Sequence, residues 1–248
     1  MKKRKENTIG VLLRMLLAAL SGAMMVLAFP GFNMGFMAFI AMVPLFFALE
    51  GRKAHEAFLL SYLAGLVFFF GTVWWLMHVT LPGMIVLAFY LAIYFGIFGV
   101  IASIGLCPSE NLSSRVLSYM ALFYIPAAWV TCEWLRSHIF TGFGWVALGY
   151  SQSASLPIIQ IADITGVYGV SFIIVMMNIA IFLTLKGQQE KGSIIELSTV
   201  IAVVIVFLCL TYGFIRLNNI FTGDKISVGV VQGIFPRMKN GTRLSGTG

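Results

Sequence analysis

The chain has 248 residues, of which 60% are hydrophobic and 10% are charged, and its mean hydropathy is +0.96. A soluble globular domain is about half apolar and about a quarter charged, so this composition argues against that class and indicates a polytopic membrane protein. The formal net charge of +7 does not indicate nucleic-acid binding, because the basic residues are scattered at the ends of apolar segments and form no stripe.

The apolar stretches predict about seven membrane spans, since a helix needs about 20 mostly apolar residues to cross a bilayer. The spans lie near residues 9–29, 34–50, 57–78, 84–106, 116–136, 159–186 and 194–216. The second stretch is short and follows the tight connection Phe29-Pro30-Gly31. The first two stretches could therefore form a hairpin that does not fully cross the membrane.

The distribution of basic residues predicts the orientation of the spans. The loops near residues 30–33, 79–83 and 137–158 contain no Lys or Arg. The opposite side carries Lys2, Lys3, Arg4, Lys5, Arg52, Lys53, Arg115, Lys186 and Lys191. Because basic loops stay in the cytoplasm, the N-terminus is predicted to be cytoplasmic. The segment 133–152 and everything after Arg216 are then expected on the outer face.

Small residues at helical spacing indicate close contacts between helices, because they let two backbones approach each other. We interpret three pairs in this way: Ala92 and Gly96, Gly99 and Ser103, and Gly166 and Gly169.

Isolated polar residues and cysteines give no metal site. His78 is expected to be a polar residue at the membrane interface, and Asp163 to stabilise the start of the sixth span. Cys107, Cys132 and Cys209 lack metal-ligand spacing and lie in or beside apolar runs, so we expect them to be small buried hydrophobic residues.

The stretch 129–152 combines polar and aromatic residues at the end of the fifth span. Trp129, Glu133 and Arg136 share one face of a helix, and such charges in an apolar chain are costly unless they are paired or face water. A helix-end ion pair followed by an ordinary interfacial loop would explain the pattern equally well.

Beyond Arg136 the sequence predicts a break in the helix. Two glycines in Thr141-Gly142-Phe143-Gly144-Trp145 favour a turn or irregular backbone. Trp145 and Tyr150 are the amphipathic aromatic residues that are typical of a membrane–water interface.

Three blocks in this order resemble the apolipoprotein N-acyltransferase family of bacterial membrane enzymes. The first block comprises residues 133–136 (EWLR), 141–145 (TGFGW) and 148–152 (LGYSQ). The second is residues 163–172 (DITGVYGVSF), and the third is residues 228–233 (VGVVQG) followed by Pro236. The resemblance covers the chain from about residue 10 to residue 236.

The resemblance implies an all-α membrane bundle over residues 1–216, followed over residues 217–248 by the start of a periplasmic nitrilase-like domain of α/β/β/α architecture. The β-branched run 226–231 is expected to be its first strand. Residues 238–248 show no periodicity, and we interpret them as disordered or as a truncated end. The implied location is the bacterial inner membrane.

The family's implied reaction moves an acyl chain from a phospholipid to the α-amino group of a diacylglyceryl-cysteine at a lipoprotein N-terminus. The implied route is a thioester on a Cys nucleophile, with a Glu base and a Lys that stabilises the oxyanion. All three are expected in the domain that this sequence only begins, so no catalytic residue is assigned here. The chain alone is expected to be inactive, with no cofactor and no metal.

Five residues are candidates for contact with the phospholipid donor and the lipoprotein acceptor: Glu133, Arg136, Trp145, Tyr150 and Gln152. Arg136 could meet a phosphate, and Trp145 and Tyr150 could lie at the glycerol–ester level of the lipid. Alternatively, these residues only fix the loop that supports the soluble domain.

Two non-enzymatic alternatives stay open. A small transporter would need ionisable residues in mid-span and broken helices in two matching halves, and the spans have almost no central charge and no visible repeat. A scaffold that binds lipids or lipoproteins without modifying them is not excluded by the sequence.

Overall fold

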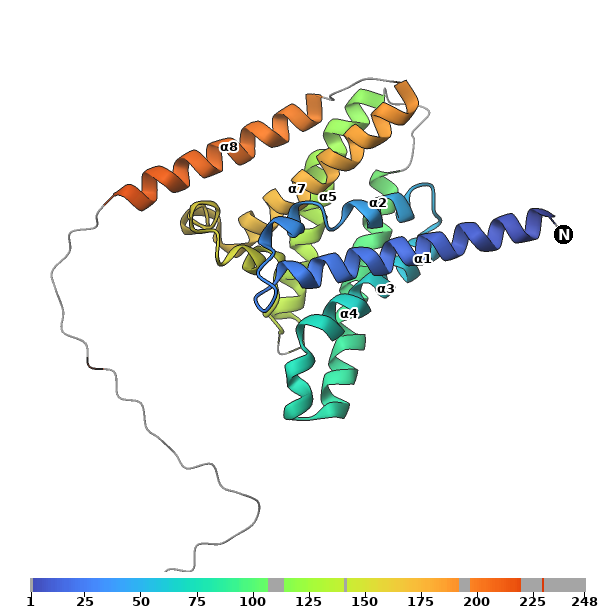
Figure 1. The fold of residues 1–248 in the computed structure, drawn as a ribbon, viewed down its shortest axis with the longest axis horizontal. Coiled ribbons are helices and arrows are strands. Elements are labelled where there is room, and N and C mark those ends of the chain that lie inside the picture. The colour runs from blue at the N-terminus through green and yellow to red at the C-terminus, as the bar shows by residue number, and fades with distance from the viewer. Residues whose placement is uncertain (1, 107–113, 141, 192–196, 220–228, 230–248) are drawn as a thin grey trace, which may run out of the picture. The chain divides into compact units, whose positions relative to one another are not determined.

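The computed structural model describes residues 2–106, 114–140, 142–191, 197–219 and 229, and within these ranges it is helical without any strand (Figure 1). Residues 1–218 form one compact unit. The predicted strand at 226–231 lies outside the described residues except for Gly229, and so does Cys107. The helices are α1 (Lys2–Ala28), η1 (Gly35–Phe39), α2 (Val43–Leu49), α3 (Ala54–Thr72), η2 (Trp74–His78), α4 (Leu81–Gly105), α5 (Ser114–His138), η3 (Leu148–Gln152), α6 (Leu156–Ile159), α7 (Ala162–Lys191) and α8 (Leu197–Asn218).

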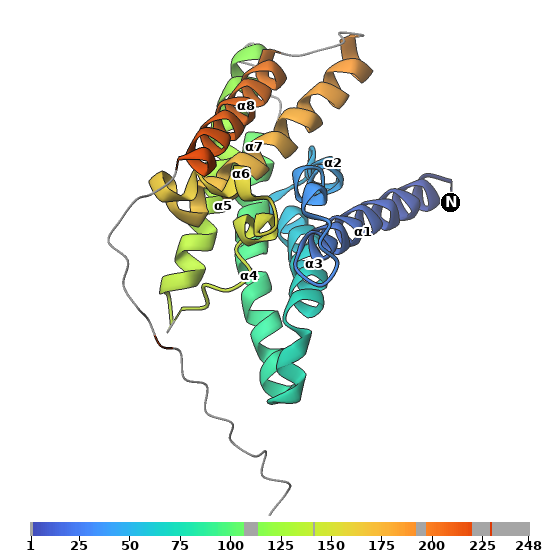
Figure 2. The same ribbon diagram turned by 60° about the vertical axis from the view of Figure 1, so that its left-hand side comes forward.

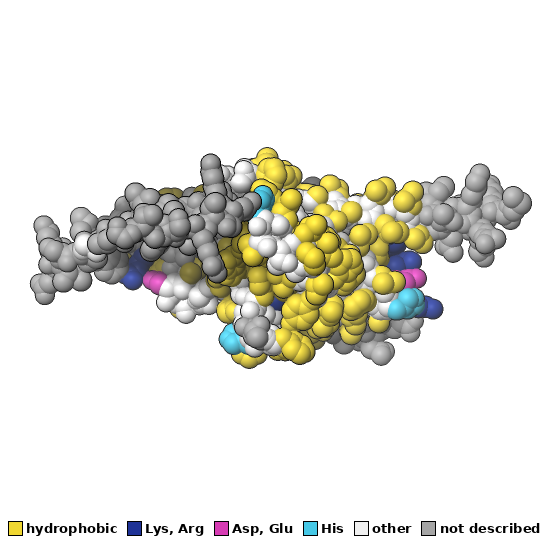
Figure 3. Space-filling model, turned by 90° about the horizontal axis from the view of Figure 1, so that it is seen from below, with side chains coloured by type: hydrophobic (Ala, Val, Ile, Leu, Met, Phe, Trp, Pro, Cys, Tyr) yellow, Lys and Arg dark blue, Asp and Glu magenta, His cyan; other side chains and the backbone are white. Residues whose placement is uncertain are grey.

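Five helices among the described residues are long and apolar enough to cross a membrane. They are Gly10–Ala28, Ala54–Thr72, Leu81–Gly105, Ala162–Gly187 and Leu197–Asn218. The predicted span at 34–50 is divided into η1 and α2, and the 25-residue α5 is not among the five. The face in Figure 3 is covered mainly by hydrophobic side chains, with the charged ones at its edges. The chain is thus a multi-pass helical membrane protein.

Helices α3 and α4 form an antiparallel hairpin, which both ribbon views show (Figures 1 and 2). Glycines make the contact close, because a Cβ atom on Gly96 or Gly99 would lie within 2.5 Å of the Phe58 or Ser61 side chain. Ala92 contacts the position of Gly65 in the same interface. The predicted packing role of Ala92, Gly96 and Gly99 is confirmed, and Ser103 is buried on the same helix.

The predicted packing pair Gly166 and Gly169 is corrected: Gly166 is not a packing residue, and the atoms nearest a Cβ on Gly169 belong to Thr165 of the same helix. A Cβ atom on Gly166 would meet nothing within 4 Å, whereas its backbone has φ +64° and ψ −173° and forms a kink near the start of α7. Glycine adopts this left-handed φ without the steric cost that a side chain would impose. The short segment before Gly166 can therefore leave the axis of the long helix.

The broken segment formed by η1 and α2 is held by side chains from three other elements. Asn178 of α7 accepts a hydrogen bond from Met42 N at 2.8 Å and donates one to Ala38 O at 2.7 Å. Gln152 Nε2 donates to Gly35 O at 2.8 Å. Arg14 of α1 donates to the last carbonyls of α2, at Ala48 and its neighbours. These bonds satisfy backbone groups that a broken helix would leave unpaired in a bilayer.

One ion pair closes the same segment at its C-terminal end. Lys186 Nζ of α7 lies 2.5 Å from Glu50 Oε1, directly after α2. The end of α2 therefore lies beside the C-terminal part of α7.

Candidate functional site: an aromatic hollow at the ends of α1 and α3

The end of α5 positions the candidate residues, and the helix stops at His138 as the glycine pattern predicts. Phe140 and Val146 both have positive φ values, as does Gly142 at +73°. A Cβ atom on Gly142 would lie 2.1 Å from Ser137 O, so only glycine fits this turn. The chain thereby reverses and brings residues 145–152 back over the end of α5.

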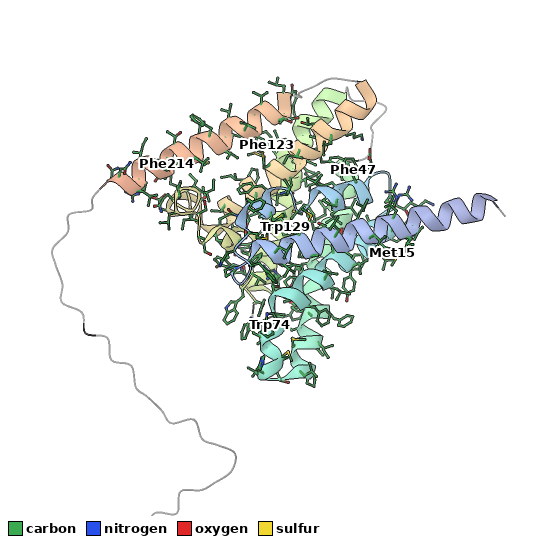
Figure 4. The ribbon with its side chains drawn as sticks, in the orientation of Figure 1. Met15, Phe47, Trp74, Phe123, Trp129 and Phe214 are labelled. Atoms are coloured by element: carbon green, nitrogen blue, oxygen red, sulfur yellow. The ribbon has the colours of Figure 1, made fainter. Side chains whose placement is uncertain are left out.

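Glu133 is buried and acts as an acceptor inside the protein. Its Oε1 accepts hydrogen bonds from Trp129 Nε1 at 2.9 Å and from Leu148 N at 2.7 Å. Its Oε2 is buried and has no hydrogen-bond partner among the described residues. Glu133 therefore ties the start of η3 to α5, and Trp129 lies at the centre of the helices (Figure 4).

Arg136 is also buried, with only 4% of its surface exposed. Its Nη1 donates a 2.6 Å hydrogen bond to Trp145 O, and its guanidinium lies 5.5 Å from the centre of the Phe69 ring. Within the described residues no ion pair joins it to Glu133. Glu133 and Arg136 still attract each other as buried opposite charges, and Arg136 adds a cation–π contact and a charge-assisted bond to a carbonyl.

Gln152 and Ser171 fix the far end of the loop. Gln152 is buried, and its Nε2 donates to Ser151 Oγ at 2.9 Å as well as to Gly35. Ser171 Oγ of α7 accepts a hydrogen bond from Gly149 N at 2.9 Å. The second family-like block, which includes Ser171, therefore contacts the first one directly.

An open hollow of about 840 Å³ lies where α1 and α3 end, next to this loop. Trp145 and Tyr150 line it and are 59% and 46% exposed, so these two candidates face the outside. Trp145 stacks on Trp75 with ring centres 5.1 Å apart, and Trp74 projects nearby (Figure 4). We call this site the aromatic hollow; it is lined by Val26, Phe29, Pro30, Gly31, Phe32, Gly71, Thr72, Trp74, Trp75, Trp145, Val146 and Tyr150.

Four of the five candidate residues therefore separate into two pairs that Val146 connects, while the buried Gln152 lines neither cavity. Val146 lines the aromatic hollow and also a small internal gap of about 10 Å³, which Glu133 and Arg136 line from below. Such a gap has room for about one water molecule. Trp145 and Tyr150 can contact a ligand, whereas the buried carboxylate and guanidinium hold the wall of the hollow in place.

Sequence reasoning missed several residues of this arrangement. Phe69 and Trp75 come from α3 and η2, and nothing in their local sequence indicates contact with residues 136 and 145. Asn178 could have been noticed, because a lone amide inside an apolar span is costly unless it is hydrogen-bonded.

The other polar residues and the described cysteines that the sequence analysis named do not line the aromatic hollow. His78 is exposed in η2, where its Nδ1 lies 3.2 Å from Trp75 O. Asp163 accepts hydrogen bonds from Tyr212 Oη at 2.9 and 2.8 Å and pairs with Arg216 Nε at 2.9 Å, so it joins α7 to α8. Cys132 and Cys209 are buried free cysteines, as expected.

Comparison with known proteins places this helical unit in a family. The family model described as "Apolipoprotein N-acyltransferase N-terminal domain" matches residues 21–180, which include α5, the loop and most of α7. The chain belongs to the apolipoprotein N-acyltransferase family.

Curated members of the family match over most of this chain. Apolipoprotein N-acyltransferase of Geobacter metallireducens is 34% identical over 231 residues, covering 88% of this chain and 43% of that protein. The proteins of the same name from Coxiella burnetii and Shewanella oneidensis are 31% and 30% identical, and cover 88% and 91% of this chain. The chain spans less than half the length of these relatives, at 45% and 43% for the latter two.

Proposed function

We propose that this chain forms the membrane part of an apolipoprotein N-acyltransferase and that the aromatic hollow receives the lipid parts of its substrates. The observation that carries the proposal is the hollow itself, which is open, lined by three tryptophans and built from the family-like loop. Tryptophan and tyrosine are suited to the glycerol–ester level of a bilayer, because their rings are apolar and their edges are polar.

The proposed reaction transfers an acyl chain from a phospholipid to the α-amino group of a diacylglyceryl-cysteine. A Cys thiolate attacks the ester carbonyl, the lysolipid leaves, and the amine then resolves the thioester to an amide. The Glu, Lys and Cys of this chemistry are assigned to a nitrilase-like domain, of which residues 217–248 supply the first strand.

In this proposal the N-terminus is cytoplasmic and the hollow lies at the periplasmic face of the inner membrane. The positive-inside distribution supports this orientation, because Arg52, Lys53 and Lys186 lie at the opposite end of the helices from Trp145. The full count of about seven spans includes α5 and the broken segment formed by η1 and α2.

Roles within the candidate set follow from burial. Trp145 and Tyr150 are proposed to contact the lipid, and Glu133, Arg136 and Gln152 are proposed to shape the mouth of the site through the backbone of the loop. Since Arg136 already donates to Trp145 O, its proposed contribution to substrate binding is the position of Trp145 rather than a direct phosphate contact.

A chimera tests the proposal. This chain replaces the matched region of the Geobacter metallireducens relative, and acyl transfer from a phospholipid to a diacylglyceryl peptide is measured. Trp145→Ala is expected to lower kcat/KM by about tenfold or more, the usual effect of losing a central aromatic contact. Trp134→Ala is the matched control, because Trp134 is exposed and stacks on His138 away from the hollow.

If Trp145→Ala and Trp134→Ala change kcat/KM equally, the aromatic hollow does not contact the substrate. A folded chimera that binds the diacylglyceryl peptide without any acyl transfer would instead favour the scaffold alternative. The exposed, aromatic lining of the hollow favours the enzyme over a transporter, which would need a polar path through the centre of the helices.

A further inference from the structure

A second hollow lies nearer the N-termini of the same two helices. Helices α1 and α3 touch closely in their C-terminal halves, where a Cβ atom on Gly22 would lie 2.5 Å from Ala64 O and one on Gly71 2.5 Å from Val26. Toward its N-terminus α1 extends past α3 (Figures 1 and 2). A hollow of about 420 Å³ remains between them there.

The lining of this basal hollow changes from charged to apolar along α3. Arg14, Arg52 and Glu56 lie at one end. The rest of the lining consists of Val11, Met15, Leu59, Leu60, Tyr62, Leu63 and Leu66. From Glu56 to Leu66 the helix rises about 15 Å, which equals about half the hydrocarbon thickness of a bilayer.

The charged end carries an excess of positive charge and an unused donor. Arg52 Nε is buried without a hydrogen-bond partner among the described residues, and Arg52 Nη1 lies 3.6 Å from Glu56 Oε2. Arg14 is held at the end of α2 by bonds from Nη1 alone. Glu50 also lies near Arg14, but its carboxylate is paired with Lys186, so the two guanidinium groups that line the hollow face one lining carboxylate, Glu56, and favour an anionic occupant.

We propose that the basal hollow binds one phospholipid of the membrane leaflet nearest the start of α3, with its phosphate at Arg52 and Arg14 and an acyl chain along the leucines of α3. Charge complementarity sets the direction of the lipid, because the phosphate matches the arginine end and the leucine end matches a hydrocarbon chain. Val11, Met15 and Leu59 are 54%, 45% and 62% exposed, so the hollow opens sideways to lipid.

This site is distinct from the aromatic hollow and does not depend on acyl transfer. Residues of α1 and α3 line both, but they come from different parts of each helix and no residue is shared. A lipid bound here would fill the gap beside α1, and it would support the end of α2 through Arg14.

Native mass spectrometry of the purified chain tests the proposal with two probes, phosphatidylglycerol and a diacylglycerol with the same acyl chains. One phosphatidylglycerol per chain is expected to remain bound under conditions that remove the diacylglycerol. Arg52→Gln is expected to weaken this binding by about tenfold, the usual effect of losing a hydrogen bond to a charged group. Lys53→Gln is the control, because Lys53 is exposed and does not line the hollow.

A second variant separates binding from folding. Leu63→Trp fills the apolar end without changing charge and is expected to remove the same lipid, while thermal unfolding shows whether each variant is folded. Equal binding of the diacylglycerol, or equal effects of Arg52→Gln and Lys53→Gln, would overturn the proposal. Displacement of the lipid by millimolar inorganic phosphate, or a lipid-free dimer, would also overturn it by assigning the hollow to a free anion or a second copy.

Discussion

Arg136 and Trp145 are joined by a 2.6 Å hydrogen bond from a buried guanidinium to a backbone carbonyl, across the turn that follows α5. The bond holds the backbone of Trp145, while the indole ring is free to stack on Trp75 and to line the aromatic hollow. Arg136, which the sequence analysis proposes as a contact for the substrate, therefore holds Trp145 in position.

Arg136→Leu is expected to loosen the loop while leaving the helices in place. A bond to a charged donor contributes about 1.5–3 kcal/mol, so local opening of residues 139–147 should become about tenfold more frequent or more. Limited proteolysis within the loop measures this. Arg52→Leu is the control, because Arg52 lies just before the start of α3 and does not contact the loop through the Arg136 bond. If both variants are cut at the wild-type rate, the bond from Arg136 to Trp145 does not hold the loop.

Glu133→Gln is expected to destabilise the protein less than Glu133→Ala does. Glu133→Gln keeps an oxygen that can accept from Trp129 Nε1 and Leu148 N but removes the charge that attracts Arg136, and it should cost less than Glu133→Ala. Glu133→Ala leaves both buried donors unpaired and should cost about 2 kcal/mol or more. Thermal unfolding in detergent compares the two; equal losses would mean that the charge matters rather than the acceptor.

Asn178→Leu is expected to destabilise the whole helical unit. The substitution removes the partners of Met42 N and Ala38 O, and each unpaired buried backbone group costs about 1–3 kcal/mol. Met177→Leu, at the neighbouring position, should change the unfolding temperature little because it keeps an apolar side chain of similar size. A native-like unfolding temperature for Asn178→Leu would contradict the proposed support of the broken segment.

Gly213→Ala is expected to disturb the contact between α8 and α6. The added Cβ atom would lie 1.8 Å from Pro157 O, and because this neighbour is backbone, one helix must move at a cost of about 1–3 kcal/mol. Gly10→Ala meets nothing within 4 Å and should stabilise α1 by up to about 1 kcal/mol. The free energy of unfolding measured for the two variants should therefore change in opposite directions.

The lengths of the hydrophobic stretches and the positions of the glycines were enough to predict most of the helices. The expected spans 84–106 and 194–216 correspond to Leu81–Gly105 and Leu197–Asn218, and the break after α5 occurs where the glycines predict it. These features are local, because each depends on a run of neighbouring residues. The resemblance identified the family, and the family match confirms it.

The contacts of the site could not be predicted in the same way, because they join distant parts of the chain. Arg136 contacts Phe69 of α3, and Gln152 bonds to Gly35 at a separation of 117 residues. Helical spacing suggests that Glu133 and Arg136 attract each other, but it does not show that each also forms a hydrogen bond with the returning loop. The direction of a long polar side chain depends on packing that single-sequence patterns do not contain.

The hydrogen bonds from Asn178 to the broken segment also imply an order of assembly during biosynthesis. Met42 is made 136 residues before Asn178, a delay of roughly 7 to 27 s at common rates of translation. During that time Met42 N and Ala38 O lack the amide that later pairs with them, and hydrocarbon offers no substitute. Residues 34–49 must therefore wait in contact with water or lipid headgroups, and they enter their final place only when α7 arrives.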